Sequence, residues 1–268
     1  MNVSPSLPPV LNAKANGVLT VTLNRPETRN ALSESMMKAL QLALDEAVED
    51  KDVKVIVLAA KGSVFSAGHH LKELTARRSD PDRGLGYYRS IFAQCSHLMQ
   101  TIVRHPRPVI AQVQGVATAA GCQLVATCDL AVASSEARFA TPGVNIGLFC
   151  STPMVALSRV VPRKAALEML FTGEAIDAQE ARRIGLVNRV VAPGDLEKET
   201  DTLARYIASK PTATLKFGKL AFQHQIELGV SGAYDYVGEV MVQNMLHEEA
   251  QEGIGAFLEK RTPKWPEK

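Results

Sequence analysis

The hydrophobic and polar positions predict strands in the first two-thirds of the chain. Residues 18–24 alternate leucine and valine with threonine, which is the period of a strand that buries one face. Residues 53–60, 109–113 and 129–133 are short, nearly continuous apolar runs, as expected of strands covered on both faces. The pattern in the first two-thirds of the chain therefore predicts a buried sheet.

A second hydrophobic period, of three to four residues, predicts helices between and after these strands. It covers residues 33–50, 86–105 and 117–127. The last of these follows a strand and a glycine turn and precedes another strand, which predicts a βαβ-like unit. After Pro142 the pattern is helical apart from one strand-like segment. The helical segments are 163–171, 177–184, 195–209, 212–227 and 233–246, and the strand-like segment is 186–191.

This order of elements predicts an α/β fold in three parts. Residues 1–16 are proline-rich and polar, and we expect them to form a flexible N-terminal arm. Residues 17–194 hold the predicted strands and should form the α/β core. Residues 195–268 should form a C-terminal helical subdomain. A chain of 268 residues is long enough for one large core with such an appendage.

Charge and cysteine content narrow the function classes. The chain has 30 basic and 28 acidic residues, without the basic excess typical of nucleic-acid binders. No apolar run has the length of a membrane span, so we expect neither nucleic acid nor membrane as a partner. The four cysteines form no CxxC pair, so no metal site is predicted. Free thiols, together with a start that lacks an apolar leader, predict a cytoplasmic protein.

Two glycine-containing loops are candidates for chemistry. The first, residues 65–72, follows a buried strand, and Gly68 permits a backbone turn that other residues resist. The second, residues 115–123, follows a strand and opens a helix, where the first amides lack internal acceptors. The structural alternatives are an ordinary strand-to-helix turn for the first loop and tight helix packing for the second.

Six segments, in order, resemble one known family. They are NRPETRNAL (24–32), FSAGHHLKEL (65–74), HPRPVIAQVQGVATAAGCQLVATCDLAVAS (105–134), FATPGVNIGL (139–148), FTGEAIDAQEARRIGLVNRVV (171–191) and FLEKRTPKW (257–265). From about Gly17 to Trp265 the chain resembles the enoyl-CoA hydratase/isomerase family, also called the crotonase family. Within it, ATAAGCQL and GVNIGLFCSTP are most similar to the vertebrate domain-containing subgroup numbered three.

The resemblance implies a fold, an assembly and a substrate class. It implies a crotonase-like spiral of ββα units, a C-terminal helical region that trimerises, and often a hexamer of two trimers. The substrate would be an acyl-CoA thioester, with coenzyme A as part of the substrate and no permanently bound cofactor. The family's two oxyanion amides correspond to the backbone N–H groups of His69 and Ala120, which would stabilise an enolate as its charge develops.

The same resemblance implies contacts with coenzyme A. Positions near the pantetheine and the phosphates correspond to Arg25 and to the backbone of Ala31 and Leu32. The adenine-side loop corresponds to Ala67, His69, His70, Leu71 and Lys72. Lys260 and Lys264 correspond to a basic tail that can reach a neighbouring subunit's phosphates.

The chain departs from the family at the two residues that handle protons. The positions of the two hydratase glutamates hold Gln123 and Gly143. Gln123 should face the same cleft as Ala120, three residues earlier on the helix, but an amide is no general base. Gly143 offers no side chain. His70 is a possible substitute, with packing against adenine or capping of a turn as its structural alternative.

We therefore expect a lyase-type acyl-CoA enzyme with altered catalysis. Decarboxylation or thioester cleavage would depend mainly on the oxyanion amides, and His69 resembles the histidine of decarboxylating members. A hydratase that uses water bound to Gln123 and another base is a second possibility. A non-catalytic acyl-CoA binder or oligomeric regulatory subunit is a third.

Overall fold

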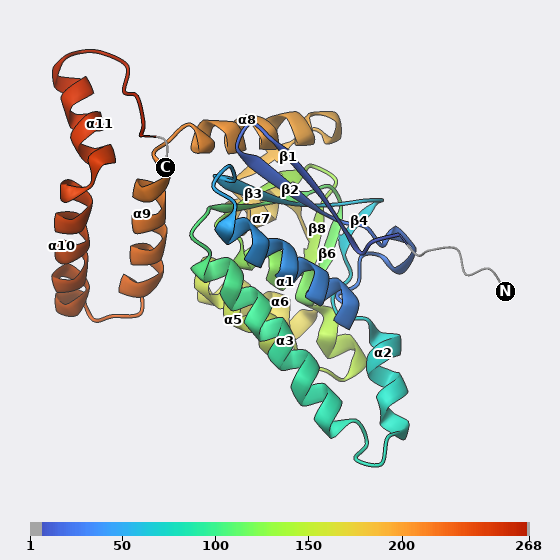
Figure 1. Ribbon diagram of the computed structural model, residues 1–268. Coiled ribbons are helices and arrows are strands. Elements are labelled where there is room, and N and C mark those ends of the chain that lie inside the picture. The colour runs from blue at the N-terminus through green and yellow to red at the C-terminus, as the bar shows by residue number, and fades with distance from the viewer. Residues whose placement is uncertain (1–6, 267–268) are drawn as a thin grey trace.

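The computed structural model describes residues 7–266, in which ten strands form two sheets flanked by helices (Figure 1). The larger sheet has the order β1-β2-β3-β5-β7-β10, and only β1 is antiparallel to its neighbour. Its strands are β1 (Val10–Ala15), β2 (Val18–Leu23), β3 (Val55–Ala60), β5 (Val109–Val113), β7 (Leu130–Ser134) and β10 (Arg189–Val191). The smaller sheet consists of β4 (Val64–Ser66), β6 (Val116–Thr118), β8 (Arg138–Ala140) and β9 (Ile176–Asp177).

The chain passes repeatedly from the larger sheet to the smaller one and then into a helix. β3 leads to β4, β5 to β6, and β7 to β8. Each pair forms one turn of a spiral, which confirms the predicted ββα architecture. Residues 117 and 118, predicted as the start of a helix, belong instead to strand β6. A three-residue strand is too short to show a period of its own.

Helices cover the sheets and end close to where the hydrophobic period ends. They are α1 (Glu34–Glu49), α2 (Leu71–Ala76), α3 (Leu85–Arg104), α4 (Ala120–Thr127), α5 (Ser151–Val160), α6 (Arg163–Thr172), α7 (Ala178–Arg183), α8 (Leu196–Ala208), α9 (Thr212–Gln225), α10 (Val230–Leu246) and α11 (Glu248–Leu258). At the start of α1, the Ser33 hydroxyl accepts a hydrogen bond from the Met36 amide at 3.1 Å, a typical N-cap. Met36, Leu40 and Leu44 of this helix lie in the main core.

Two parts of the chain differ from the predicted boundaries. Residues 10–15, assigned to a flexible arm, form β1 and pair with β2 from Val10 opposite Leu23 to Ala15 opposite Val18. Residues 1–6 lie outside the described residues. Helix α8, assigned to the C-terminal subdomain, packs through Leu196 and Ala204 against the larger sheet. The valines on this face of the sheet are buried because α8 packs over them.

Helices α9, α10 and α11 form an arm beside the rest of the molecule (Figure 1). None of the residues of α10 is buried. The arm is fixed to the core by Lys219 of α9, whose ammonium lies 2.7 Å from the Asp129 carboxylate at the start of β7. Between residues 7 and 266, no helix is both long and apolar enough to cross a membrane.

Candidate active site

The first glycine loop connects β4 to α2 and lies against the segment that precedes α1. The Leu32 amide donates to the Gly68 carbonyl at 2.7 Å, and the Ala67 amide donates to the Arg29 carbonyl at 3.0 Å. Leu32 and His69 form a parallel bridge. In a parallel bridge one residue forms hydrogen bonds to the chain neighbours of the other. Here the Leu32 amide bonds the carbonyl of Gly68, the neighbour of His69, so the amide of His69 faces away from Leu32.

The second loop turns the chain from β6 into α4 through a strained residue. Ala119 has φ 50° and ψ −120°, a conformation that costs a non-glycine residue on the order of 1–3 kcal/mol. Its amide donates to the Ala140 carbonyl at 2.9 Å, which fixes the turn against β8. Ala120 follows as the first residue of α4, where an amide has no acceptor within the helix.

The two loops touch through their glycines. Gly68 has φ +85°, and a Cβ there would lie 2.9 Å from the Ala119 Cβ and 3.1 Å from the Ala120 nitrogen. A Cβ at Gly121 would lie 2.2 Å from the Ser66 carbonyl oxygen. Only glycine allows this approach, so backbone from the first loop lies directly beside the N-terminus of α4.

Three polar side chains around this helix start have buried atoms without a hydrogen-bond partner among residues 7–266. They are Gln123 through Oε1, Thr141 through Oγ1 and His69 through both ring nitrogens. Gln123 is 5% exposed and Thr141 is fully buried. Sequence reasoning selected Gln123 and His69 but missed Thr141, because a lone threonine before Pro142 gives no signal.

The surroundings of Gly143 leave no room for a side chain. This residue lies in a short 3-10 helix, Pro142–Ile146, and its amide donates to Cys150 Sγ at 3.3 Å. A Cβ would lie 2.6 Å from the Leu148 carbonyl oxygen and 2.9 Å from Cys150 Sγ. The backbone and a cysteine therefore fill the space beside Gly143.

The histidines have separate environments. His70 Nδ1 accepts a hydrogen bond from the Glu73 amide at 3.3 Å, so this residue caps α2 as its structural alternative predicted. The His69 ring packs edge-on against Phe92 of α3, with ring centroids 5.3 Å apart. Burial lowers the pKa of His69 and so disfavours the charged form of its ring.

The nearby cysteine thiols stay protonated. Burial raises the pKa of Cys122 to about 12, with a smaller contribution from Cys150. Burial also raises the pKa of Cys150, opposed by the Gly143 amide. Because the thiolate is the nucleophilic form, neither cysteine is suited to nucleophilic attack. Among residues 7–266, no group of three or more His, Cys, Asp or Glu side chains is arranged to hold a metal ion.

Of the residues predicted to contact coenzyme A, those in the N-terminal half of the chain lie in or beside the first loop, whereas Lys260 does not. Ala31 and Leu32 lie beside the first loop through the Leu32–His69 bridge, and Arg25 is held close by, since its amide donates to Asn30 Oδ1 at 2.9 Å. Ala67, Leu71 and Lys72 lie within or directly after the loop, and the last two are exposed. Lys260, in contrast, follows α11 in the chain, and α11 lies on the C-terminal arm, away from α2 (Figure 1).

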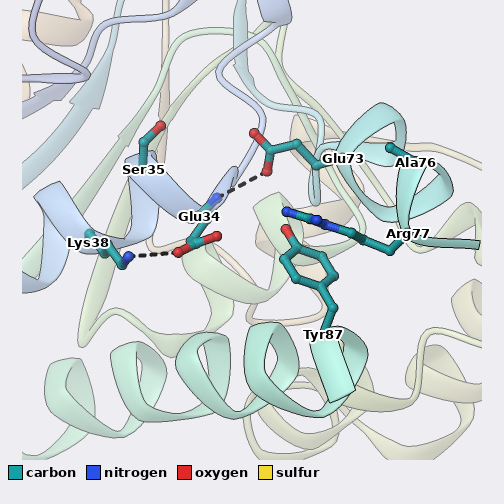
Figure 2. Close-up of a pocket in the computed structure, with 7 residues that line it drawn as sticks. All are labelled: Glu34, Ser35, Lys38, Glu73, Ala76, Arg77 and Tyr87. Carbon is teal, nitrogen blue, oxygen red and sulfur yellow. Dashed lines mark hydrogen bonds and ion pairs between the residues drawn. The ribbon is translucent and has the colours of Figure 1, made fainter. Parts of the chain in front are cut away.

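A groove of about 400 Å³ lies behind the first loop, among α1, α2 and α3. Figure 2 shows that Glu34 and Lys38 face Glu73, Arg77 and Tyr87 across it. The Glu73 carboxylate accepts from the Glu34 amide at 3.2 Å, which ties α2 to the start of α1. The groove contains none of the predicted site residues, and its acidic and basic groups are matched in number.

Comparison with known proteins identifies the fold's family. The model of the enoyl-CoA hydratase/isomerase family matches residues 13–268. The human protein named enoyl-CoA hydratase domain-containing protein 3, mitochondrial, is 49% identical over 257 residues, 96% of this chain and 83% of the human one. The chain belongs to the enoyl-CoA hydratase/isomerase family.

Solved structures agree with this membership in the acyl-CoA enzyme family. The crystal structure of an enoyl-CoA hydratase from Mycobacterium smegmatis is 53% identical, covers 97% of this chain and 99% of its own, and gives a TM-score of 0.92. The crystal structure of human enoyl coenzyme A hydratase domain-containing protein 3 is 49% identical, covers 96% of this chain and 100% of its own, and gives a TM-score of 0.91. The predicted crotonase fold and the resemblance to the subgroup numbered three are confirmed.

The expectation of a cytoplasmic protein is wrong. The rat, human and mouse relatives, at 50%, 49% and 50% identity, are all named as mitochondrial. The prediction depended on free cysteines and on the composition of residues 1–16. Buried free thiols fit every reducing compartment, so cysteine content does not distinguish one from another.

Proposed function

We propose that this protein is an acyl-CoA enzyme that polarises the thioester carbonyl with the backbone amides of His69 and Ala120. The observation that carries the proposal is the close approach of Gly68 to Ala119 and Ala120, with 3.1 Å between a Gly68 Cβ position and the Ala120 nitrogen. Because packed backbone already holds these N–H donors in place, little free energy is spent on reorienting them as an enolate or tetrahedral oxygen gains charge. The positive end of α4 adds to the attraction.

The residues around these amides support a reaction that needs no pair of carboxylates. The amide of Gln123 does not titrate usefully, and the space beside Gly143 is filled by Cys150 and Leu148. General acid and base groups contribute about 10²–10⁴-fold each, so water addition by the usual glutamate pair is lost. Decarboxylation releases CO₂ and leaves an enolate that takes up a proton, and thioester hydrolysis adds water and releases the thiol of coenzyme A. In both reactions the charge develops on the thioester oxygen, so both depend mainly on the two amides.

The contacts with coenzyme A are part of the same proposal. Arg25, Ala31, Leu32, Ala67, His69, His70, Leu71 and Lys72 would line the nucleotide and pantetheine path beside the first loop. Lys260 would act only on a neighbouring subunit's ligand, because it lies on the C-terminal arm. We infer no permanently bound cofactor.

Self-association is supported by the apolar surface of that arm. Exposed large apolar side chains occur on α9, α10 and α11, among them Phe222, Tyr234, Met241, Met245 and Phe257. Apolar clusters of this kind mark interfaces between protein chains. We propose that the arm is the trimerisation surface.

The test compares two glycine variants that share the same backbone strain. In Gly68→Ala, the new Cβ would push on Ala119 and Ala120, whereas in Gly17→Ala, at φ +78°, it would meet nothing closer than 3.4 Å. Turnover is measured on crotonyl-CoA hydration, malonyl-CoA decarboxylation and acyl-CoA hydrolysis. We expect Gly68→Ala to lower kcat/KM for the active substrate by about 10²-fold, as when one oxyanion donor is displaced, and Gly17→Ala to leave it unchanged.

The alternatives give different results in the same assays. Fast hydration of crotonyl-CoA by the unaltered protein would favour a hydratase that uses water held by Gln123. Calorimetric binding of CoA thioesters without turnover on any of them would favour a non-catalytic acyl-CoA binder. If no CoA thioester binds, the proposed function is wrong.

A further inference from the structure

The His69 amide, one of the two proposed oxyanion donors, takes its direction from the peptide unit that it shares with the Gly68 carbonyl. A trans peptide is planar, so its N–H and its C=O point in opposite directions. The Leu32 amide holds the Gly68 carbonyl at 2.7 Å. Whatever fixes the position of Leu32 therefore also fixes the direction in which the His69 N–H points.

Leu32 belongs to a short segment, residues 29–32, with an uncommon backbone. Arg29 and Asn30 have φ of 54° and 50°, in the left-handed region that few residues other than glycine adopt and that asparagine tolerates better than most. The segment touches the first loop at a second point, because the Arg29 carbonyl accepts the Ala67 amide at 3.0 Å. Two consecutive residues in this region need contacts from elsewhere to hold them.

The side chain of Asn30 supplies these contacts and is fully buried. Its Nδ2 donates to the carbonyl oxygens of Lys61 and Val64, both at 2.8 Å, and its Oδ1 accepts the Arg25 amide at 2.9 Å. Both hydrogens of the side-chain amide are thus used. These bonds tie segment 29–32 to the chain between β3 and β4, which leads into the first loop.

Ser66 connects Asn30 to the loop itself. Its hydroxyl, also fully buried, donates to the Asn30 carbonyl at 2.9 Å and accepts the Gly68 amide at the longer distance of 3.4 Å. Gly68 is therefore held on both sides, at its nitrogen by Ser66 and at its carbonyl by Leu32. These two contacts leave the peptide unit that follows little freedom to rotate.

We propose that Asn30 and Ser66 are positioning residues that direct the His69 N–H toward the thioester oxygen, acting through the Gly68 peptide rather than by contact with the substrate. The proposal rests on the proposed function above. A donor contributes to an oxyanion site when it points at the oxygen that gains charge, and a misplacement of about 1 Å can lower the rate on the order of 10²-fold.

The stretching frequency of a bound thioester carbonyl reports its hydrogen-bond donors and needs no turnover. The full chain is mixed with butyryl-CoA, with and without ¹³C at the thioester carbonyl, and infrared difference spectra are recorded. We expect the unaltered protein to lower the frequency below that of the free ligand, and Ser66→Ala to reverse part of this shift. Glycine accepts a positive φ, so Asn30→Gly removes the side-chain bonds without new backbone strain and should reverse more of it.

Ser134 provides the matched control. It is also buried, and its hydroxyl accepts the amide two residues further on, that of Glu136, at 3.1 Å, but it ends β7 in the larger sheet. Ser134→Ala should lower the melting temperature, as Ser66→Ala does, and leave the carbonyl frequency unchanged. On a thioester that the protein turns over, Ser66→Ala should lower kcat about tenfold, less than the loss of a whole donor, with little change in KM.

Two results would overturn the proposal: a carbonyl frequency in Ser66→Ala equal to that of the unaltered protein, or an equal change of frequency in Ser134→Ala. In both cases the unaltered protein still polarises the carbonyl, and the proposed function stands. If the unaltered protein binds butyryl-CoA without lowering the frequency, the proposed function itself fails and this proposal with it. Should Asn30→Gly not fold, Ser66→Ala alone decides the outcome.

Discussion

Lys219 is the residue whose replacement should destabilise the protein most clearly, because it is a buried cation that connects the C-terminal arm to the core. Its Nζ lies 2.7 Å from Asp129 Oδ2, 2.9 Å from the Ile102 carbonyl oxygen and 3.0 Å from the Arg107 carbonyl oxygen. The Lys219 and Asp129 side chains are only 6% and 17% exposed. Replacing Lys219 by methionine keeps the unbranched side chain up to its last atom and removes the charge.

The expected cost follows from what remains after the change. Asp129 would keep the Val109 amide at 2.7 Å but lose its counter-ion in a buried site. Removing one partner of a buried pair costs about 3–5 kcal/mol. For a chain of this size that corresponds to a fall in melting temperature of about 10 °C.

The effect should depend on pH in a defined direction. Burial raises the pKa of Asp129, and Lys219 opposes this, so the pKa rises further in Lys219→Met. A carboxyl whose pKa is higher in the folded than in the unfolded state destabilises the fold above its unfolded value of about 4. The loss in Lys219→Met should therefore be larger at pH 7 than at lower pH and shrink as the pH falls toward 4.

Thermal and denaturant unfolding at equal protein concentration measure this loss. Lys216→Met, on the exposed face of the same helix, is the control and should change stability by less than about 0.5 kcal/mol. Adding Asp129→Asn to Lys219→Met should recover part of the loss, since the uncompensated charge is gone. Equal stability of the two methionine variants, or a loss independent of pH, would refute the reasoning.

Three further predictions concern the candidate site. Gln123→Glu should raise crotonyl-CoA hydration at least tenfold and add an acidic limb to its pH profile, because it restores one general base; a rate equal to that of the unaltered protein contradicts this. Gly143→Ala should lower the free energy of unfolding by about 1–3 kcal/mol, because its Cβ would lie 2.6 Å from the Leu148 carbonyl oxygen. Gly194→Ala is the control, because a Cβ there would have nothing within 4 Å. It should have little effect in the same denaturation experiment. Native Cys122 should resist alkylation by iodoacetamide at pH 8, because burial raises its pKa to about 12; rapid labelling measured by mass spectrometry would exclude this.

The sequence by itself determined the elements that have a hydrophobic period. Strands such as β3 and β5 and helices such as α1 and α3 lie where that period predicts them, because burial of one face or both dictates which residues are apolar. It also determined the family, through six ordered segments, and the absence of glutamates at Gln123 and Gly143.

Only the tertiary structure decided how these parts meet. β6 and β8 have three residues each, too few for a period, and they exist because neighbouring strands supply their hydrogen bonds. α8 has an apolar face, and its position on the sheet depends on which apolar surface the other helices leave uncovered. Contacts between residues distant in sequence, such as Lys219 with Asp129, have no local pattern that reports them.

The candidate site shows the same division. Its two loops could be selected from glycines and small residues, because backbone conformation is a local property. Their approach at Gly68, the filling of space beside Gly143 by Cys150, and the unpaired hydroxyl of Thr141 depend on packing between separate segments. The sequence specified which residues could take part in a reaction, and the tertiary structure decided which of them lie together in one site.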